Sequence, residues 1–100
     1  MPYAEPGRAR WSLTTPHARV LLCIAEDPTV RVRDISDTTG LALRTVQAIL
    51  GQLEADGALE RRRNGRRNVY RIIGDYRPAD PIEAAAPLEH WLGAIRAQDA

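Results

Sequence analysis

The sequence contains no lysine and only one cysteine, and these two scarcities narrow the class of protein. Cys23 has no second cysteine with which to form an internal disulfide, which suits a reducing cytosol. No apolar run approaches the roughly eighteen residues that a membrane-spanning helix needs. Residues 1–8 lack the apolar core of a secretory signal. We therefore expect a cytoplasmic protein with no membrane partner, and 100 residues fit one small domain.

Motifs that carry catalytic or metal chemistry are also lacking. Ser12, His17 and Asp27 come nearest to a triad, but no nucleophile elbow accompanies them. The glycines are isolated rather than gathered in a phosphate-binding loop. His17, His90 and Cys23 are too dispersed for a metal-ligand spacing, and only a site built across a dimer interface would bring them together. We expect no enzyme activity, no metal site and no cofactor, with Cys23 as a small core residue.

Basic residues are plentiful even though the net charge is only +1. All fourteen are arginine, which either a codon bias or bidentate phosphate contacts would explain. Residues 58–77 carry seven arginines against Glu60 and Asp75, a net charge of +5, whereas residues 78–100 carry −3. This segregation indicates one positive face and one acidic end.

The most basic stretch has the pattern of a β-hairpin. Asn64-Gly65 is a strong hairpin signal, because both residues tolerate the positive φ of a type I′ turn. With these two at the turn, Leu59 faces Tyr70, and the predicted tip pairs are Arg63 with Arg66, Arg62 with Arg67 and Arg61 with Asn68. The apolar residues then share one face near the base. The repulsion between the arginines at the tip would be relieved by a polyanion such as a duplex backbone.

Helical signals precede this hairpin. Residues 1–10 show no periodicity and are expected to form a flexible arm. Thr15-Pro16 predicts the start of a helix that is apolar nearly all round and ends at Asp27-Pro28. The β-branched residues of 29–32 predict a short edge strand. A helix over residues 34–39 then ends at Gly40.

A second helix follows this short glycine-containing turn, so the pair predicts a helix-turn-helix. Its apolar stripe is Val46, Ile49, Leu50 and Leu53. Its end is marked by Gly57.

The C-terminal part has a different character. Residues 74–86 are rich in turn formers and are expected to be a linker. Residues 87–98 predict a helix whose apolar stripe would form a dimer interface through Leu88, Trp91, Leu92 and Ile95. The alternative is that this helix packs back on its own first helix together with Trp11.

The order helix, short strand, helix, turn, helix, hairpin resembles the MarR/ArsR-type bacterial and archaeal transcriptional regulators. The most specific part is the junction Leu53-Glu54-Ala55-Asp56-Gly57 before Leu59 and the arginine-rich hairpin. The resemblance implies a mainly α fold with a small β-hairpin: a winged helix-turn-helix domain over residues 11–73 with an additional C-terminal helix. It also implies a homodimer on double-stranded DNA. One departure is Ala42, where the family usually has a Ser or Thr cap.

The DNA-binding side chains are then expected on the second motif helix and on the wing. Arg44 and Gln47 suit base edges, with phosphate contact as the alternative for Arg44. Thr45 caps the helix or contacts a phosphate, and Ala48 and Gly51 allow close approach, although a tolerated surface glycine is equally expected. The wing candidates for phosphate or minor groove are Arg62, Arg63, Arg66 and Arg67. Arg61 and Arg71 are closer to the body and are expected to pair with Glu60 or another acid.

Two other functions remain open. The fold could be a protein-interaction module, which would show no salt-dependent duplex binding. The hairpin could instead grip structured RNA, although no exposed aromatic side chains accompany it. A small-molecule effector, if one exists, is expected at the dimer seam, because only about twenty-five residues follow the wing.

Overall fold

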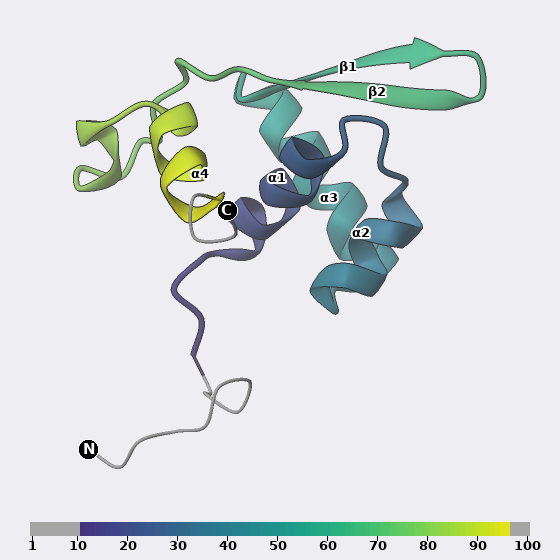
Figure 1. Cartoon of the computed structure of the whole chain (residues 1–100), viewed down its shortest axis with the longest axis horizontal. Helices are drawn as coiled ribbons and strands as arrows, with labels where there is room; N and C mark the ends of the chain where they lie inside the picture. Colours follow the sequence, from purple (N-terminus) through teal and green to yellow (C-terminus); the bar gives the residue numbers. More distant parts are fainter. Residues whose placement is uncertain (1–10, 97–100) are drawn as a thin grey trace.

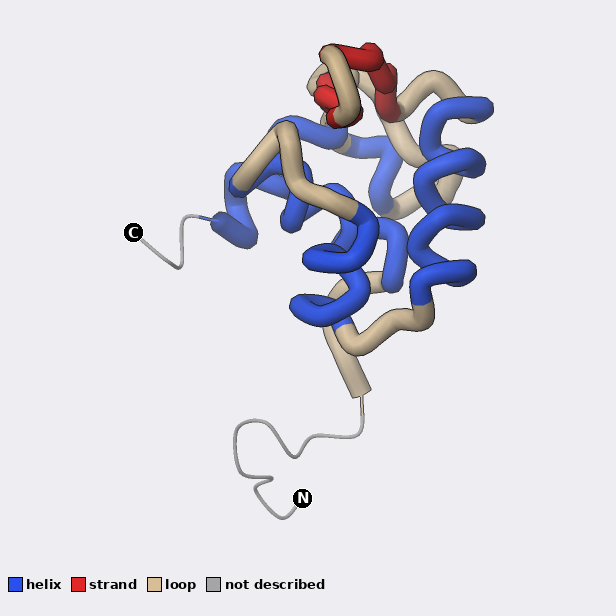
Figure 2. Tube along the Cα trace, turned by 90° about the vertical axis from the view of Figure 1, so that its right-hand side faces the viewer, coloured by secondary structure: helices blue, strands red, loops and turns tan. Residues whose placement is uncertain are grey.

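The computed structural model describes residues 11–96, and the predicted arm at residues 1–10 lies outside them. The described elements are, in order, α1 (Pro16–Glu26), α2 (Val32–Thr39), α3 (Leu43–Ala55), β1 (Leu59–Asn64), β2 (Arg67–Ile72), the 3-10 helix η1 (Glu83–Ala85) and α4 (Leu88–Arg96). The hairpin of β1 and β2 lies along one side of the helices (Figures 1 and 2). The fold is therefore mainly α with one small β-hairpin, as predicted.

The first helix begins and ends where the local signals place it. The Thr15 hydroxyl accepts a hydrogen bond from the Ala18 amide at 3.2 Å, and Pro16 occupies the first turn. The helix buries Val20, Leu21 and Ile24, whereas the neighbouring Leu22 and Cys23 are only half-buried. One face of α1 therefore belongs to the core, and the opposite face is less covered than its apolar composition predicts.

The predicted strand at residues 29–32 is wrong. The Asp27 carboxylate accepts hydrogen bonds from the Thr29 amide at 3.0 Å and the Thr29 hydroxyl at 2.8 Å, which bends the chain directly after α1. Helix α2 already begins at Val32, two residues before the predicted start. This bend leaves the connecting loop alongside β2, where the Tyr70 amide donates to the Pro28 carbonyl at 2.9 Å. The segment thus occupies the place of an edge strand without strand geometry.

The turn between α2 and α3 is held by side-chain hydrogen bonds from α1 and α2. Gly40 adopts the left-handed φ of 77° that ends α2, as predicted. The Arg19 guanidinium of α1 donates to the Thr39 carbonyl at 2.6 Å, and the Ser36 hydroxyl donates to the Leu41 carbonyl at 2.6 Å. The last carbonyl of α2 therefore has a donor from α1, and the first residue after Gly40 is tied back to α2.

The core lies between α1, α2 and α3 and continues under the base of the hairpin. The predicted stripe of α3 is buried in full, and it meets Ile24 of α1 and Ile35 of α2 in one apolar cluster. Each such side chain contributes about 1.5–3 kcal/mol on burial. This cluster holds the helix-turn-helix as one unit and leaves the opposite face of α3 to solvent.

The hairpin forms, but its register differs from the predicted one. Leu59 pairs with Ile72, Arg61 with Tyr70 and Asn64 with Arg67, so Gly65-Arg66 makes the turn instead of Asn64-Gly65. Gly65 has a φ of 63°, and no described residue other than glycine has a positive φ, which is the pattern of a type II′ turn. Because the slip is two residues, the same side chains still share each face. Leu59 and Tyr70 are accordingly buried, as predicted.

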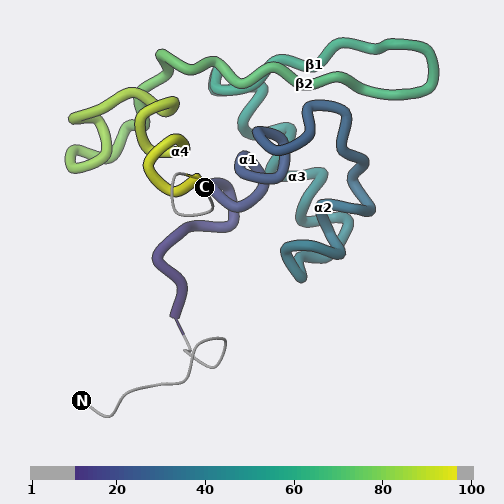
Figure 3. Tube along the Cα trace, in the orientation of Figure 1, coloured from purple at the N-terminus to yellow at the C-terminus, as the bar shows by residue number. Residues whose placement is uncertain are grey.

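Residues 74–86, predicted as a linker, are tied closely to the body. The Tyr76 carbonyl accepts a hydrogen bond from the Leu88 amide at 2.7 Å, and the Gly74 carbonyl accepts one from the Glu89 amide at 2.9 Å. The Tyr76 side chain is half-buried against the core, and Arg77 donates to the Ala84 carbonyl at 2.7 Å. The segment therefore folds back and delivers α4 to the side of α1 (Figure 3).

Helix α4 divides its predicted dimerisation residues between two environments. Leu88 and Leu92 are buried in the core of the same chain, which was the alternative to a dimer stripe. Trp91 and Ile95 stay partly exposed, and the Trp91 indole donates to the Glu83 carbonyl at 3.0 Å. Trp11, expected to join α4 on this alternative, is exposed. The helix ends at Arg96, and residues 97–98 of the predicted helix lie outside the described range.

Candidate nucleic-acid interface

One face of α3 is solvent-exposed over its whole length. Arg44, Thr45, Gln47, Ala48 and Gly51 are all exposed, opposite the buried stripe. The helix starts at Leu43 directly after Ala42, whose side chain makes no capping hydrogen bond. The missing cap therefore leaves the first amides of α3 without a side-chain acceptor, beside the side chains expected to contact DNA.

Gly51 has open space where a side chain would stand. An added Cβ would meet no atom within 4 Å, and the φ of this glycine is not in the left-handed region. No contact within the described part of the chain requires glycine there. The low side-chain profile of Ala48 and Gly51 therefore leaves the middle of this face open to a close neighbour.

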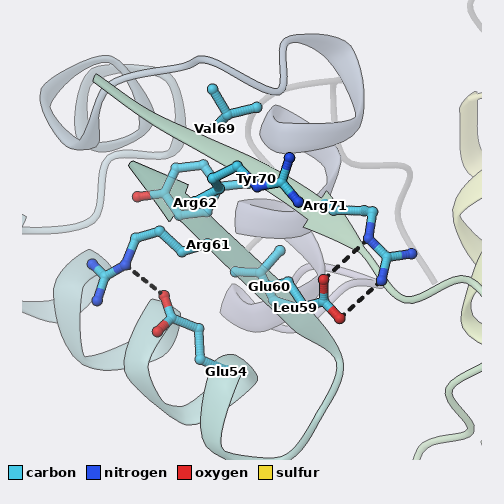
Figure 4. Close-up of a pocket in the computed structure, with 8 residues that line it drawn as sticks. All are labelled: Glu54, Leu59, Glu60, Arg61, Arg62, Val69, Tyr70 and Arg71. Carbon is cyan, nitrogen blue, oxygen red and sulfur yellow. Dashed lines mark hydrogen bonds and ion pairs between the residues drawn. The ribbon is translucent and has the colours of Figure 1, made fainter. Parts of the chain in front are cut away.

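Two wing arginines are held by acids, as expected for those nearest the body (Figure 4). The Arg71 guanidinium donates to Glu60 across the hairpin, at 2.8 Å and 3.1 Å. Arg61 Nε lies 3.2 Å from Glu54 Oε1 at the last turn of α3, and this contact is an ion pair without hydrogen-bond alignment. These pairs line an open hollow of about 690 Å³ beside β1, in which acids offset much of the positive charge.

The four arginines predicted as phosphate contacts are all exposed, but they differ in their partners. Arg63 donates to the Gly65 carbonyl at 3.1 Å, and Arg67 donates to the Thr29 carbonyl at 3.1 Å. The side chains of Arg62 and Arg66 make no hydrogen bond or ion pair with any residue in the described range 11–96. These two are therefore the least engaged cations of the wing.

Sequence reasoning missed a link between α1 and α3. His17 Nε2 lies 2.6 Å from Gln52 Oε1, and both side chains are exposed. His17 follows the spacing of the apolar face of α1, so its pattern indicated nothing about a partner on another helix. The contact joins residues far apart in sequence, and no local signal could have revealed it.

The histidine and cysteine side chains considered as metal ligands are not brought together in the described residues 11–96. Over residues 11–96 the structure contains no group of three His, Cys, Asp or Glu side chains that could hold a metal ion. Burial raises the pKa of the Cys23 thiol, and the nearby Arg19 opposes this rise. Within the same range no helix has the length and apolar character needed to cross a membrane.

A helix-turn-helix followed directly by a two-stranded wing defines a winged helix-turn-helix protein. The sequence profile of the MarR family matches residues 11–67, more than half of the chain. The chain therefore belongs to the MarR family, whose members are DNA-binding transcription regulators and not enzymes. The predicted resemblance is confirmed for its MarR branch.

Among solved structures, the chain is similar to the PcaV transcriptional regulator from Streptomyces coelicolor, crystallised in complex with its natural ligand. The TM-score is 0.52 at 20% sequence identity, over 85% of this chain and 62% of PcaV. This likeness supports the winged-helix fold, and the chain spans less than two thirds of the length of PcaV. None of the curated proteins matches the sequence.

Proposed function

We propose that the protein is a sequence-specific regulator that binds double-stranded DNA. In this proposal α3 enters the major groove and the wing lies along the backbone or minor groove. The observation that carries it is the concentration of exposed arginines on the wing, beside an exposed helix face with little side-chain bulk. Such a regulator acts where the chromosome lies, which in a bacterium or archaeon is the cytoplasm.

The roles of the α3 side chains follow from their chemistry. Gln47 can pair bidentately with adenine, and Arg44 can pair with guanine or with a phosphate. Thr45 near the start of the helix suits a phosphate contact, and Ala48 allows bases to approach the backbone. The wing arginines Arg62, Arg63, Arg66 and Arg67 supply affinity that is independent of sequence.

The first test is a titration of a labelled random-sequence duplex, followed by fluorescence anisotropy at several salt concentrations. We expect log affinity to fall steeply with log salt, because each phosphate contact releases condensed counterions. A duplex RNA of the same length should bind less tightly, because its deep major groove does not admit α3. A flat, weak response to both duplexes would instead support a protein-interaction module.

Replacing Gln47 with alanine should relax specificity and leave general affinity unchanged. Sites selected from a random duplex library by the wild type should show a preferred base that the variant no longer prefers, corresponding to about 1–3 kcal/mol of discrimination. Gln52→Ala is the matched control, because Gln52 also lies on α3 but bonds to His17. Identical selected sites from the wild type and the Gln47 variant would exclude base readout by this side chain.

The proposed active unit is a homodimer that uses α4. Support comes from Trp91 and Ile95, which stay partly exposed although Leu88 and Leu92 of the same helix are buried. Other large apolar side chains outside the helix-turn-helix also remain exposed, namely Trp11, Leu13 and Ile82. A two-fold partner would cover this apolar area and set the spacing of two half-sites on the duplex.

A further inference from the structure

A second hollow lies between the wing and the segment that leads into α2. Its volume is about 430 Å³, and its lining includes Arg31 from the body and Arg66 and Arg67 from the wing. The loop before α2 passes beneath the outer half of the hairpin, so the two sides come from parts of the chain far apart in sequence (Figures 1 and 3). Arg31 did not stand out in the sequence, because it belongs to no basic cluster there.

The charge of this hollow is of one sign. Its lining contains three arginines and no acidic residue, in contrast to the larger hollow beside β1. The Asp27 carboxylate at the start of the loop accepts two hydrogen bonds from Thr29, which are the largest causes that lower its pKa, and the charge of Arg67 is a further cause. Asp27 therefore offsets part of the Arg67 charge, but it does not line the hollow beside Arg31 and Arg66.

The three arginines are not equivalent. Arg67 donates to the Thr29 carbonyl at 3.1 Å and so ties the wing to the loop. Arg31 precedes the first turn of α2 and makes no capping hydrogen bond, and Arg66 stands at the turn of the hairpin. The guanidinium group of neither Arg31 nor Arg66 has a hydrogen-bond or ion-pair partner among residues 11–96. The guanidinium groups of Arg31 and Arg66 are therefore available to a ligand at this hollow, while Arg67 links its two sides.

The occupant that fits is a phosphate group, because guanidinium forks match phosphate oxygens bidentately. A duplex lying along the wing presents a row of such groups at the tip of the hairpin. We propose that Arg31 and Arg66 grip one backbone phosphate of the bound duplex between them, an inference that rests on the proposed function. The contact joins the body to the wing tip, so it sets the orientation of the wing on the DNA.

The first test compares Arg31, directly before α2, with Arg33 in the first turn of α2. Arg31→Ala should weaken duplex binding about tenfold and reduce the salt slope by roughly one, because a charge-assisted contact to one phosphate is lost. Arg33→Ala removes the same charge from an exposed position that does not line the hollow, and its affinity should stay within about twofold of wild type. Equal effects of the two substitutions would overturn the proposal.

A double-mutant cycle tests whether the two arginines share one phosphate. The Arg31→Ala, Arg66→Ala double variant should lose less affinity than the product of the two single losses, because either removal already spoils the grip. The Arg31→Ala, Arg62→Ala pair is the control and should lose the full product, since Arg62 does not line this hollow. If the affinity losses multiply in both double variants, Arg31 and Arg66 do not contact the same phosphate.

Two further outcomes separate this inference from the proposed function. A wild type without salt-dependent duplex binding would overturn the proposed function itself. If the wild type binds the duplex as expected and Arg31→Ala binds it equally well, only the proposed contact of Arg31 and Arg66 with one phosphate would be overturned. Saturable binding of inorganic phosphate to the free protein at sub-millimolar concentration, seen as NMR shifts at Arg31, would assign the hollow to a free anion instead.

Discussion

Replacing Arg62 and Arg66 together with alanine is expected to weaken duplex binding about a hundredfold at constant salt. Each arginine is exposed and has no partner within residues 11–96, so its charge is available to a phosphate. Losing one charge-assisted contact corresponds to about tenfold in affinity, and the slope of log affinity against log salt should fall by roughly two. Anisotropy titrations of one duplex at several salt concentrations measure both quantities.

The control should remove an arginine whose charge is already paired with an acid in the structure. Glu60→Gln combined with Arg71→Gln deletes the ion pair across the hairpin and leaves the net charge unchanged. This pair is exposed, so its loss should alter stability by less than about 1 kcal/mol and leave the salt slope in place. If the Arg62 and Arg66 double variant matched this control in affinity and slope, the wing would lie outside the DNA interface.

Replacing Leu92 with alanine is expected to destabilise the folded chain by about 3 kcal/mol. Leu92 is only 5% exposed and packs in the core with α1, so the substitution leaves a cavity there. Trp91 is 36% exposed, and Trp91→Ala removes one hydrogen bond, for which we expect about 1 kcal/mol. Urea unfolding monitored by far-UV circular dichroism would measure both differences.

The same two variants separate packing within the chain from association. Trp91→Ala should shift the mass by light scattering from dimer toward monomer at a concentration where it remains folded. Leu92→Ala should affect the mass only where unfolding begins. A Trp91 variant with unchanged mass would rule out α4 as the dimer interface and leave this tryptophan a packing role alone.

The sequence was a good guide wherever a structural feature depends on neighbouring residues. Thr15-Pro16 and Gly40 mark helix ends through local hydrogen bonds and a local φ, and both predictions were correct. The stripe of α3 was correct because burial follows the helical period. The edge strand failed because the Asp27 side chain bends the chain before residues 29–32 can extend.

Features that depend on distant partners were predicted less well. The hairpin was found, but Gly65 could occupy either central position of the turn, and only the packing of β2 on the body selects between the two registers. The arginine content was plain, yet which arginines are free depends on Glu54 and on the Thr29 carbonyl. Arg31 joins the wing only through the path of the loop before α2.

The hydrogen bond from Arg19 to the Thr39 carbonyl has a mechanical consequence. It attaches the end of α2 to α1, while the Gln52 side chain attaches α3 to His17 of the same helix. Helices α2 and α3 are thus each joined to α1 by a side-chain hydrogen bond, and we expect little movement of the three helices relative to one another. In the dimeric regulator proposed above, a signal that changes DNA occupancy is therefore expected to move α1, α2 and α3 together relative to the second copy.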